Sequence, residues 1–466
     1  MSKRIPPLDL SWLVLESPDT PMHVGGLLTF ALPDDAPADF LQRIATRLRA
    51  ERRFEAPWNL QVSRSLRDKL MPRWVEEKDV DLDHHFRHVA LPAPGGELEL
   101  GNLVSELHSR PLDLRRPLWE LHLIEGLAPN RFAVYLKIHH SLIDGVSVMR
   151  LLMDMLSDNP DDTAITPIWT VPATAPAPAG RRNALPSVSG VVRATTGLVD
   201  AFTRPLRDDT LVAPYSSPRS SLSAPMNAQR RFTTTRAPLA DLKAAAAASG
   251  GTVNDIVLWL CATALRGYLH ETDKLPTRSL TAAVPVNLRD DADFSVGTNI
   301  GHLLTNLATD ETDPKQRLEK IIASTRAAKN HMEAMPREAR YPYTLAATSS
   351  IALGQLTKLD GLVPPMFSLV VSNVPGPKHS KYLAGAKLEA VYPISLLMRG
   401  GALNITVVTV DGVMNFGFVG ARDALPHLQR LGTHLDEAVT ELPQLTTGRM
   451  EASHDARQET RPRAYR

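Results

Sequence analysis

The stretch 131–145 constrains the fold of this chain more than any other part of its sequence. Apolar residues occupy every second position from Phe132 to Ile138, which is the period of a β-strand with one well-buried face. From Gly145 onward the period changes to that of an amphipathic helix. His139 and His140 stand at this junction, where side chains can face a cleft. A neutral imidazole there can accept a proton from a hydroxyl near pH 7.

Three other interpretations of this string are open. Asp144 stands where an N-cap residue is expected, and aspartate is among the best caps. Either histidine could be a core residue with satisfied hydrogen bonds. His140 and Asp144 are also spaced to share a metal ion on one helix face, but the chain shows no third ligand in a recognisable pattern. We therefore expect no metal site.

Composition and turn residues predict four regions. Residues 1–158 form an N-terminal half that contains the two histidines, and 227–445 form a C-terminal half that starts again with strand and helix patterns. Between them, 159–226 is rich in Pro, Ala and Thr and is predicted to be a crossover linker. The last region, 446–466, is polar and highly charged, so we expect it to be disordered.

The overall composition is that of a globular protein with no bias toward nucleic acid. The formal net charge is +1, so no global field attracts phosphate backbones. The single cysteine, Cys261, excludes an internal disulfide framework and is typical of a reducing cytoplasm. We expect neither a signal peptide nor a membrane-spanning segment, because no apolar run is long enough. The sequence does not indicate an oligomeric state.

Two further groups of histidines occur in the first half. His23 lies in the segment Pro-Met-His-Val-Gly-Gly, and we expect a structural role for it. His84 and His85 form a second histidine pair, but they lack the following Asp-Gly and lie among charged residues. We therefore expect this second pair at the surface.

Five short motifs together resemble one enzyme family. The string H-H-x-x-x-D-G at 139–145 is similar to the active-site motif of the CoA-dependent acyltransferase superfamily. The other four motifs narrow the resemblance to the bacterial wax ester synthase/acyl-CoA:diacylglycerol acyltransferases. They are Pro-Met-His-Val-Gly-Gly at 21–26, Pro-Leu-Trp at 117–119, Val-Asn-Asp at 253–255 and Ser-Asn-Val-Pro-Gly-Pro at 372–377.

The resemblance implies a particular fold and a histidine that acts as the catalytic general base. The fold would be α/β, with two chloramphenicol-acetyltransferase-like halves, each a mixed sheet with flanking helices, and an active-site tunnel between them. His140 would be the general base that deprotonates the hydroxyl of a long-chain alcohol or a diacylglycerol, which then attacks the thioester of acyl-CoA. His139 would shape the site. Asp144 would be structural and pair with an arginine, for which Arg289 is the candidate.

The tetrahedral intermediate also needs a hydrogen-bond donor at its oxyanion. The resemblance points to the Ser372 hydroxyl, and Asn254 is the other candidate. No metal or bound cofactor is implied, because CoA arrives and leaves with the acyl donor.

Two alternative functions stay open at this point. One is a condensation-type acyltransferase that uses a carrier-bound donor, although the chain contains no carrier or adenylation segment. The other is a catalytically inactive lipid-binding protein of storage droplets. Because the substrates of the acyltransferase reaction are nearly insoluble, we expect peripheral contact with a membrane or lipid droplet. The segment 185–207 carries apolar residues beside arginines, and it either lies on lipid or packs on a domain as part of the crossover.

Overall fold

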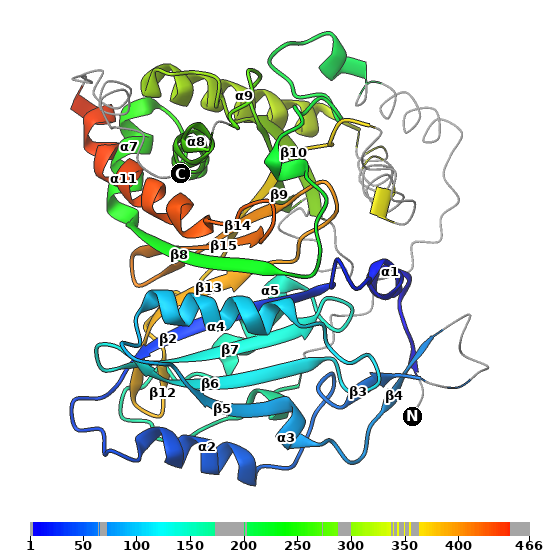
Figure 1. Ribbon diagram of the computed structural model, residues 1–466, viewed down its shortest axis with the longest axis vertical. Helices are drawn as coiled ribbons and strands as arrows, with labels where there is room; N and C mark the ends of the chain where they lie inside the picture. Colours follow the sequence, from blue (N-terminus) through cyan, green and yellow to red (C-terminus); the bar gives the residue numbers. More distant parts are fainter. Residues whose placement is uncertain are drawn as a thin grey trace.

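The computed structural model describes residues 3–63, 65, 72–172, 200, 203–272, 274–287, 300–336, 339, 343, 349, 354–355 and 363–447. Within them, two six-stranded mixed sheets are each accompanied by helices (Figure 1). A small third sheet consists of β1 (Lys3–Arg4), β4 (Arg73–Glu76) and β3 (Leu60–Val62). The expected α/β architecture with two halves is confirmed.

The first sheet contains the strand that ends in the two histidines. Its strands, in spatial order, are β12 (Tyr382–Leu383), β13 (Ala386–Ile394), β2 (His23–Ala31), β7 (Arg131–His139), β6 (Trp119–Leu127) and β5 (Phe86–Ala90). Strands β6 and β7 are antiparallel neighbours and form a hairpin. Both faces of β7 are buried, not one, so Lys137 lies in the interior.

Helices cover both faces of this sheet. On one face, Leu28 and Phe132 pack in a core with α2 (Phe40–Ala50) and α5 (Gly145–Asp154). On the other face, Leu27 and Tyr135 share a core with α4 (Glu97–Ser109). Two short helices, α1 (Pro7–Leu15) and α3 (Leu82–His85), lie near the end of the sheet at which β7 finishes and β5 begins.

The second sheet belongs to the C-terminal half. Its strands, in spatial order, are β10 (Ile300–Asn306), β9 (Thr281–Asn287), β11 (Leu369–Val374), β14 (Leu403–Val410), β15 (Val413–Ala421) and β8 (Arg230–Pro238). Its helices are α7 (Leu239–Ser249), α8 (Val253–Glu271), α9 (Pro314–Ala334) and α11 (Leu428–Thr447). Asp411 and Gly412 both have positive φ, as a tight hairpin turn between β14 and β15 requires.

The two halves are joined by strand exchange and by a shared helix. Although β13 comes late in the chain, it pairs with β2 and so belongs to the first sheet. Helix α4 lies between the first sheet and β8 (Figure 1). There the hydroxyls of Ser105 and Ser109 accept hydrogen bonds from the backbone of Phe232 and Arg230, each at 2.8 Å. The sheets therefore do not follow the linear boundaries of the sequence.

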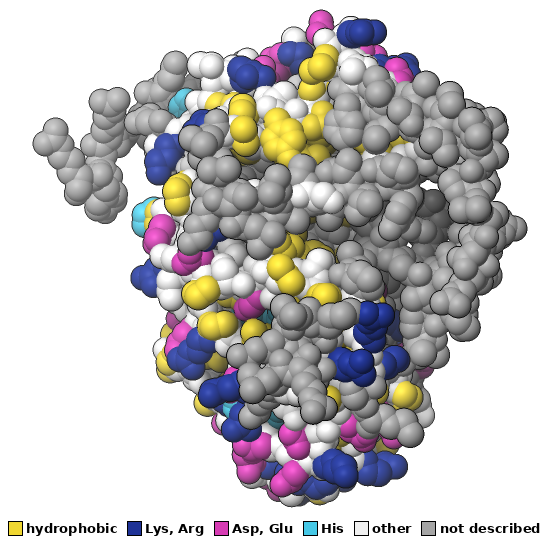
Figure 2. All heavy atoms as spheres, turned by 90° about the vertical axis from the view of Figure 1, so that its right-hand side faces the viewer, with side chains coloured by type: hydrophobic (Ala, Val, Ile, Leu, Met, Phe, Trp, Pro, Cys, Tyr) yellow, Lys and Arg dark blue, Asp and Glu magenta, His cyan; other side chains and the backbone are white. Residues whose placement is uncertain are grey.

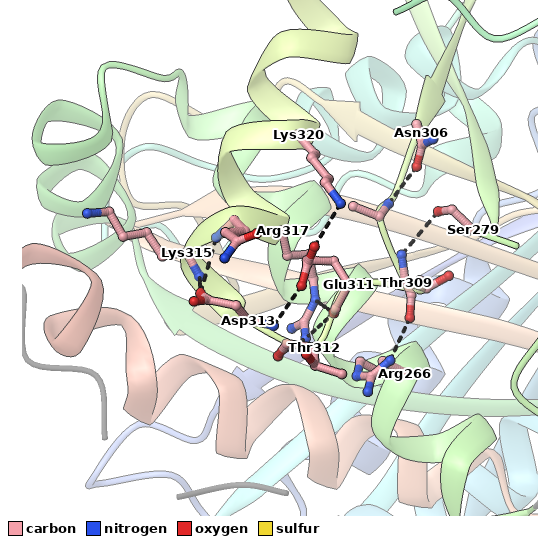
Figure 3. Close-up of polar contacts among 12 residues, drawn as sticks. Arg266, Ser279, Asn306, Thr309, Glu311, Thr312, Asp313, Lys315, Arg317 and Lys320 are labelled. Carbon is pink, nitrogen blue, oxygen red and sulfur yellow. Dashed lines mark hydrogen bonds and ion pairs between the residues drawn. The ribbon is translucent and has the colours of Figure 1, made fainter. Parts of the chain in front are cut away.

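In the loop before α9, side chains cap the helix and form hydrogen bonds with the loop backbone (Figure 3). Asp313 is the N-cap of α9 and accepts the backbone N–H of Lys315 at 2.8 Å. Arg317 donates to the carbonyl of Glu311 at 2.9 Å, and Arg266 donates to that of Thr309 at 2.9 Å. These bonds satisfy polar groups of a tight loop that would otherwise be left unpaired.

Part of the predicted linker packs against the first half. In the residues of the linker that the structure describes, 3₁₀ turns occur at Ile168–Thr170, Arg204–Leu206 and Ser221–Ser223. Trp169 is fully buried and stacks on Trp119 with ring centroids 5.7 Å apart. Residues 173–199 and most of the tail predicted to be disordered lie outside the described residues.

Candidate active site

A cavity of about 620 Å³ brings residues of both halves together. Its volume is in the usual range for small-molecule sites. The wall is mostly apolar and is interrupted by a few polar groups. His140 and Trp12 come from the first half, and His302, Ser372, Ser395 and Asn404 come from the second. The cavity therefore has the composition expected of a site for a lipid-like substrate.

His140 is fixed at the end of β7 by its backbone and by an aromatic neighbour. Its N–H donates to the carbonyl of Met22 at 2.8 Å. The ring lies 4.2 Å from that of Trp12, centroid to centroid. Its Nδ1 is enclosed by the protein, so Nε2 is the nitrogen available to a substrate.

The electrostatics of His140 keep it neutral. Burial lowers its pKa to about 4, although its own backbone carbonyl and the charge of Asp144 act in the opposite direction. A neutral imidazole can accept a proton, whereas a protonated one cannot. At neutral pH the group is thus already in the form that a general base requires.

His139 points away from the chemistry and is held by hydrogen bonds. Its Nδ1 accepts the backbone N–H of Ser141 at 3.1 Å, which leaves the proton on Nε2. Nε2 lies 3.3 Å from a carboxylate oxygen of Glu16, and the same oxygen accepts the N–H of Met22. His139 therefore ties the end of α1 to the motif, and its role in shaping the site stays a prediction.

Asp144 is the N-cap of α5, as one interpretation of the sequence predicted. Its carboxylate accepts the backbone N–H of Ser147 at 2.9 Å and the hydroxyl of the same residue at 3.1 Å. Its charge, after burial, is also the second cause that raises the pKa of Asp9 to about 6. Arg289 lies outside the described residues, so the expected ion pair with Asp144 stays a prediction.

The two candidate oxyanion donors lie on neighbouring elements. Ser372 is on β11 and lines the cavity. Asn254 lies in the first turn of α8 and, among the described residues, accepts a 3.5 Å hydrogen bond from Asn373. Thr252, not Asn254, is the N-cap of α8, and Asp255 completes its capping box. Ser372 is therefore the better placed of the two.

The motifs are brought together in pairs. The N–H of His139 donates to the carbonyl of Leu118 at 2.9 Å, so the Pro-Leu-Trp motif adjoins the histidines. The bond from His140 to Met22 does the same for the motif at 21–26. Asn373 and Asn254 join the remaining two. Motifs that are far apart in the sequence thus lie side by side, and three of them contribute Val24, His140 and Ser372 to the cavity wall.

Two other histidine assignments have clear outcomes. His23 is buried, and its Nε2 lies 2.8 Å from the carbonyl oxygen of His108, as a structural residue would. The expectation that the second histidine pair lies at the surface is wrong for His85. It is buried, stacks on Trp119 at 4.6 Å, and its Nδ1 lies 2.7 Å from the carbonyl of that residue. The charged residues next to this pair in the sequence led to the prediction of a surface position, and the contact with Trp119 depends on packing between distant segments.

Several residues of the cavity were not predicted. Trp12 and Asn404 carry no local signal, because their place beside the cavity depends on tertiary packing. His302 lies on β10, and burial lowers its pKa. In the described part of the chain, no group of three or more His, Cys, Asp or Glu side chains is placed to hold a metal ion.

Comparison with known proteins identifies the family. The catalytic-domain model of wax ester synthase/diacylglycerol acyltransferases matches residues 5–257, and the C-terminal domain model of the same family matches 296–443. The chain belongs to this family. The O-acyltransferase WSD of Acinetobacter baylyi is 36% identical over 449 residues, which cover 93% of this chain and 95% of that protein.

Solved structures agree with the family and with the fold. The wax ester synthase/diacylglycerol acyltransferase from Marinobacter aquaeolei VT8 has a TM-score of 0.77 and 37% identity, covering 95% of this chain and 99% of that one. The first condensation domain of the CDA synthetase has a TM-score of 0.56 and 16% identity, covering 97% and 98%. The second likeness is one of fold alone.

Proposed function

We propose that this O-acyltransferase moves a long-chain acyl group from acyl-CoA to the hydroxyl of a fatty alcohol or a diacylglycerol, with His140 as the base. The observation that carries the assignment is the neutral His140 at the wall of a mostly apolar cavity. Nε2 takes the hydroxyl proton as the oxygen attacks the thioester carbonyl. When the intermediate collapses, the C–S bond breaks and the CoA sulfur receives that proton.

Ser372 supplies the hydrogen bond that stabilises the charge on the carbonyl oxygen. It lines the same cavity as His140, and its hydroxyl makes no hydrogen bond to the described residues. A donor of this kind is worth about 3–4 kcal/mol when its hydrogen bond strengthens in the transition state. The reaction uses no bound cofactor, since CoA is part of the substrate.

The test is the substitution His140→Ala with palmitoyl-CoA and hexadecanol as substrates. We expect the rate of thiol release to fall by about 10²–10⁴-fold, the usual contribution of a general base. His84→Ala is the matched control, because His84 belongs to the other histidine pair and lies outside the cavity lining. His140→Ala activity within tenfold of wild type would exclude the assignment.

A carrier-bound donor is the alternative substrate. The same acyl chain is therefore offered once on CoA and once on a carrier protein's phosphopantetheine. Preferred turnover of acyl-CoA supports the proposal, and preferred turnover of the carrier thioester supports a condensation-type enzyme. Folded protein that turns over neither would support lipid binding without catalysis.

We further propose that the protein contacts lipid peripherally at the mouth of the cavity. None of the described helices is, by itself, long and apolar enough to cross a bilayer. On the face shown in Figure 2, a group of hydrophobic side chains lies in the upper part below a row of charged ones, and further charged side chains cover the lower end. Val363 lines the cavity and is 52% exposed, and Leu206 is 73% exposed between Pro205 and Arg207.

Liposome co-sedimentation of Leu206→Ser and Val363→Ser tests this contact. We expect weaker binding than for Leu98→Ser, which removes from α4 an apolar residue about as exposed as Val363. The predicted segment 185–207 lies mostly outside the described residues, and its substitutions Val192→Ser and Leu198→Ser belong in the same series. Equal binding by all variants would contradict the contact.

A further inference from the structure

A second polar group on the cavity wall is oriented by two hydroxyls. Ser395 and Asn404 line the cavity, and Thr406 connects them. The Thr406 hydroxyl donates to Oδ1 of Asn404 at 2.9 Å. The hydroxyls of Ser395 and Thr406 are 3.1 Å apart. Because Thr406 has one proton and gives it to Asn404, Ser395 must be the donor to Thr406.

This chain of bonds determines which end of the Asn404 amide is free. Its oxygen is occupied by Thr406, so its NH₂ group remains. That group donates to none of the described residues, although Asn404 is only 7% exposed. Because Asn404 borders a mostly apolar cavity, its NH₂ group is placed to donate to a ligand that brings an acceptor into that cavity. The free group is a donor only, so its ligand atom must be an acceptor.

The strand register separates this donor from the proposed oxyanion site. Strands β11 and β14 are parallel, with Val370 opposite Asn404 and Ser372 opposite Thr406. Residues opposite each other in neighbouring strands share a face of the sheet, and successive residues on that face are about 6.6 Å apart along the strand. Asn404 therefore stands one row away from Ser372, where it faces a different part of the substrate.

The chemistry of the acceptors indicates what that part is. A fatty alcohol has one polar atom, its hydroxyl, which must lie at His140. The thioester carbonyl must lie within reach of Ser372. A diacylglycerol brings two further ester carbonyls, which accept hydrogen bonds and donate none. We infer that Asn404 binds an ester carbonyl of the diacylglycerol acceptor and is a specificity-determining residue. This inference rests on the proposed function.

The experiment compares two acceptors that differ only in those carbonyls. 1,2-Dioleoylglycerol and its diether analogue 1,2-dioleylglycerol have the same free hydroxyl and nearly the same chains. Both are presented in the same mixed micelles with palmitoyl-CoA. We expect wild type to favour the diester by about tenfold in kcat/KM, the value of one neutral hydrogen bond. Asn404→Ala and Asn404→Asp should bring that ratio close to one.

Thr406→Val removes the group that orients the amide and should give an intermediate ratio. Thr409→Val is its matched control, because Thr409 lies on the same strand but alternates to the other face of the sheet, away from the hydrogen bonds that join Ser395, Thr406 and Asn404. A ratio that survives in Asn404→Ala would overturn the inference, and so would a wild type that does not distinguish the two acceptors.

Acylation of hexadecanol by the same preparations separates the remaining outcomes. If Asn404→Ala loses hexadecanol and diester activity to the same extent while its melting temperature is kept, Asn404 serves the thioester and the inference is wrong. If wild type itself acylates none of the three acceptors, the proposed function fails instead.

Discussion

His140 should keep its base form at acidities at which an ordinary histidine would have lost it. With a pKa of about 4, compared with the usual 6.5, about 90% of the enzyme retains the neutral base at pH 5. With an unshifted pKa, only about 3% would retain it. The acid limb of kcat/KM should therefore have its midpoint near pH 4, unless another group intervenes.

The same shift links stability to pH. Burial disfavours the protonated form in the folded state only, so the unfolded chain binds this proton first as the pH falls. The contribution to stability is complete above pH 6.5 and is lost progressively down to about pH 4. At pH 5, about 1.5 pH units below the pKa of the unfolded chain, the free energy of unfolding is lower by about 2 kcal/mol. His140→Gln should lack this part of the pH dependence.

Two measurements check this prediction. Palmitoyl-CoA turnover with hexadecanol is followed from pH 4.5 to 8, and denaturant unfolding of wild type and His140→Gln is compared at pH 7 and pH 5. Other buried histidines also titrate, but they are common to both proteins, so the difference isolates His140. An acid limb centred near pH 6.5, or an identical loss of stability in both proteins, would refute the reasoning.

Three further predictions concern neighbouring groups. Ser372→Ala should lower kcat by about 10²–10³-fold with little change in KM, and a change in KM alone would assign Ser372 to ground-state binding. Lys137 is fully buried, forms an ion pair with Glu120 at 3.1 Å, and donates to the carbonyls of Leu107 and Arg110 at 3.0 and 2.9 Å. Lys137→Met should lower the free energy of unfolding in urea by about 3–5 kcal/mol, because it leaves the Glu120 charge without its partner. Adding Glu120→Gln should recover part of that loss. Asp9 has a raised pKa because burial and the charge of Asp144 disfavour its ionised form. Its ionisation therefore lowers the stability of the fold progressively from about pH 4 to pH 6, and by the full amount above pH 6. Asp9→Asn should raise the melting temperature more at pH 8 than at pH 5, and an equal rise at both would contradict the assignment.

Local sequence patterns predicted the elements on both sides of the two histidines. The period of two up to Ile138 and the change of period at Gly145 each predicted an element that the structure contains, because these signals depend only on neighbouring residues. The place of His140 at the end of a strand followed from the same patterns.

The remaining features depend on partners that are distant in the sequence. Lys137 sits in an alternating pattern that suggested an exposed position, yet Glu120 and two carbonyls at the end of α4 make its burial possible. Trp12 stacks on His140 from across the fold. Asn404 lies in an apolar strand, and only the neighbouring hydroxyls reveal its orientation. No periodicity within a short window contains this information.

The late strand β13 has a consequence for how the chain folds during synthesis. Its partner β2 and the active-site strand β7 are complete once residue 139 has been made, but β13 ends at residue 394, about 250 residues later. At about 5–20 residues per second, the ribosome needs roughly 10–50 s to deliver it. During that time β2 remains an unpaired edge, which is a hazard for aggregation. The order of synthesis and the order of assembly therefore differ in this protein, and a nascent chain stalled near residue 257 should still need protection by a chaperone.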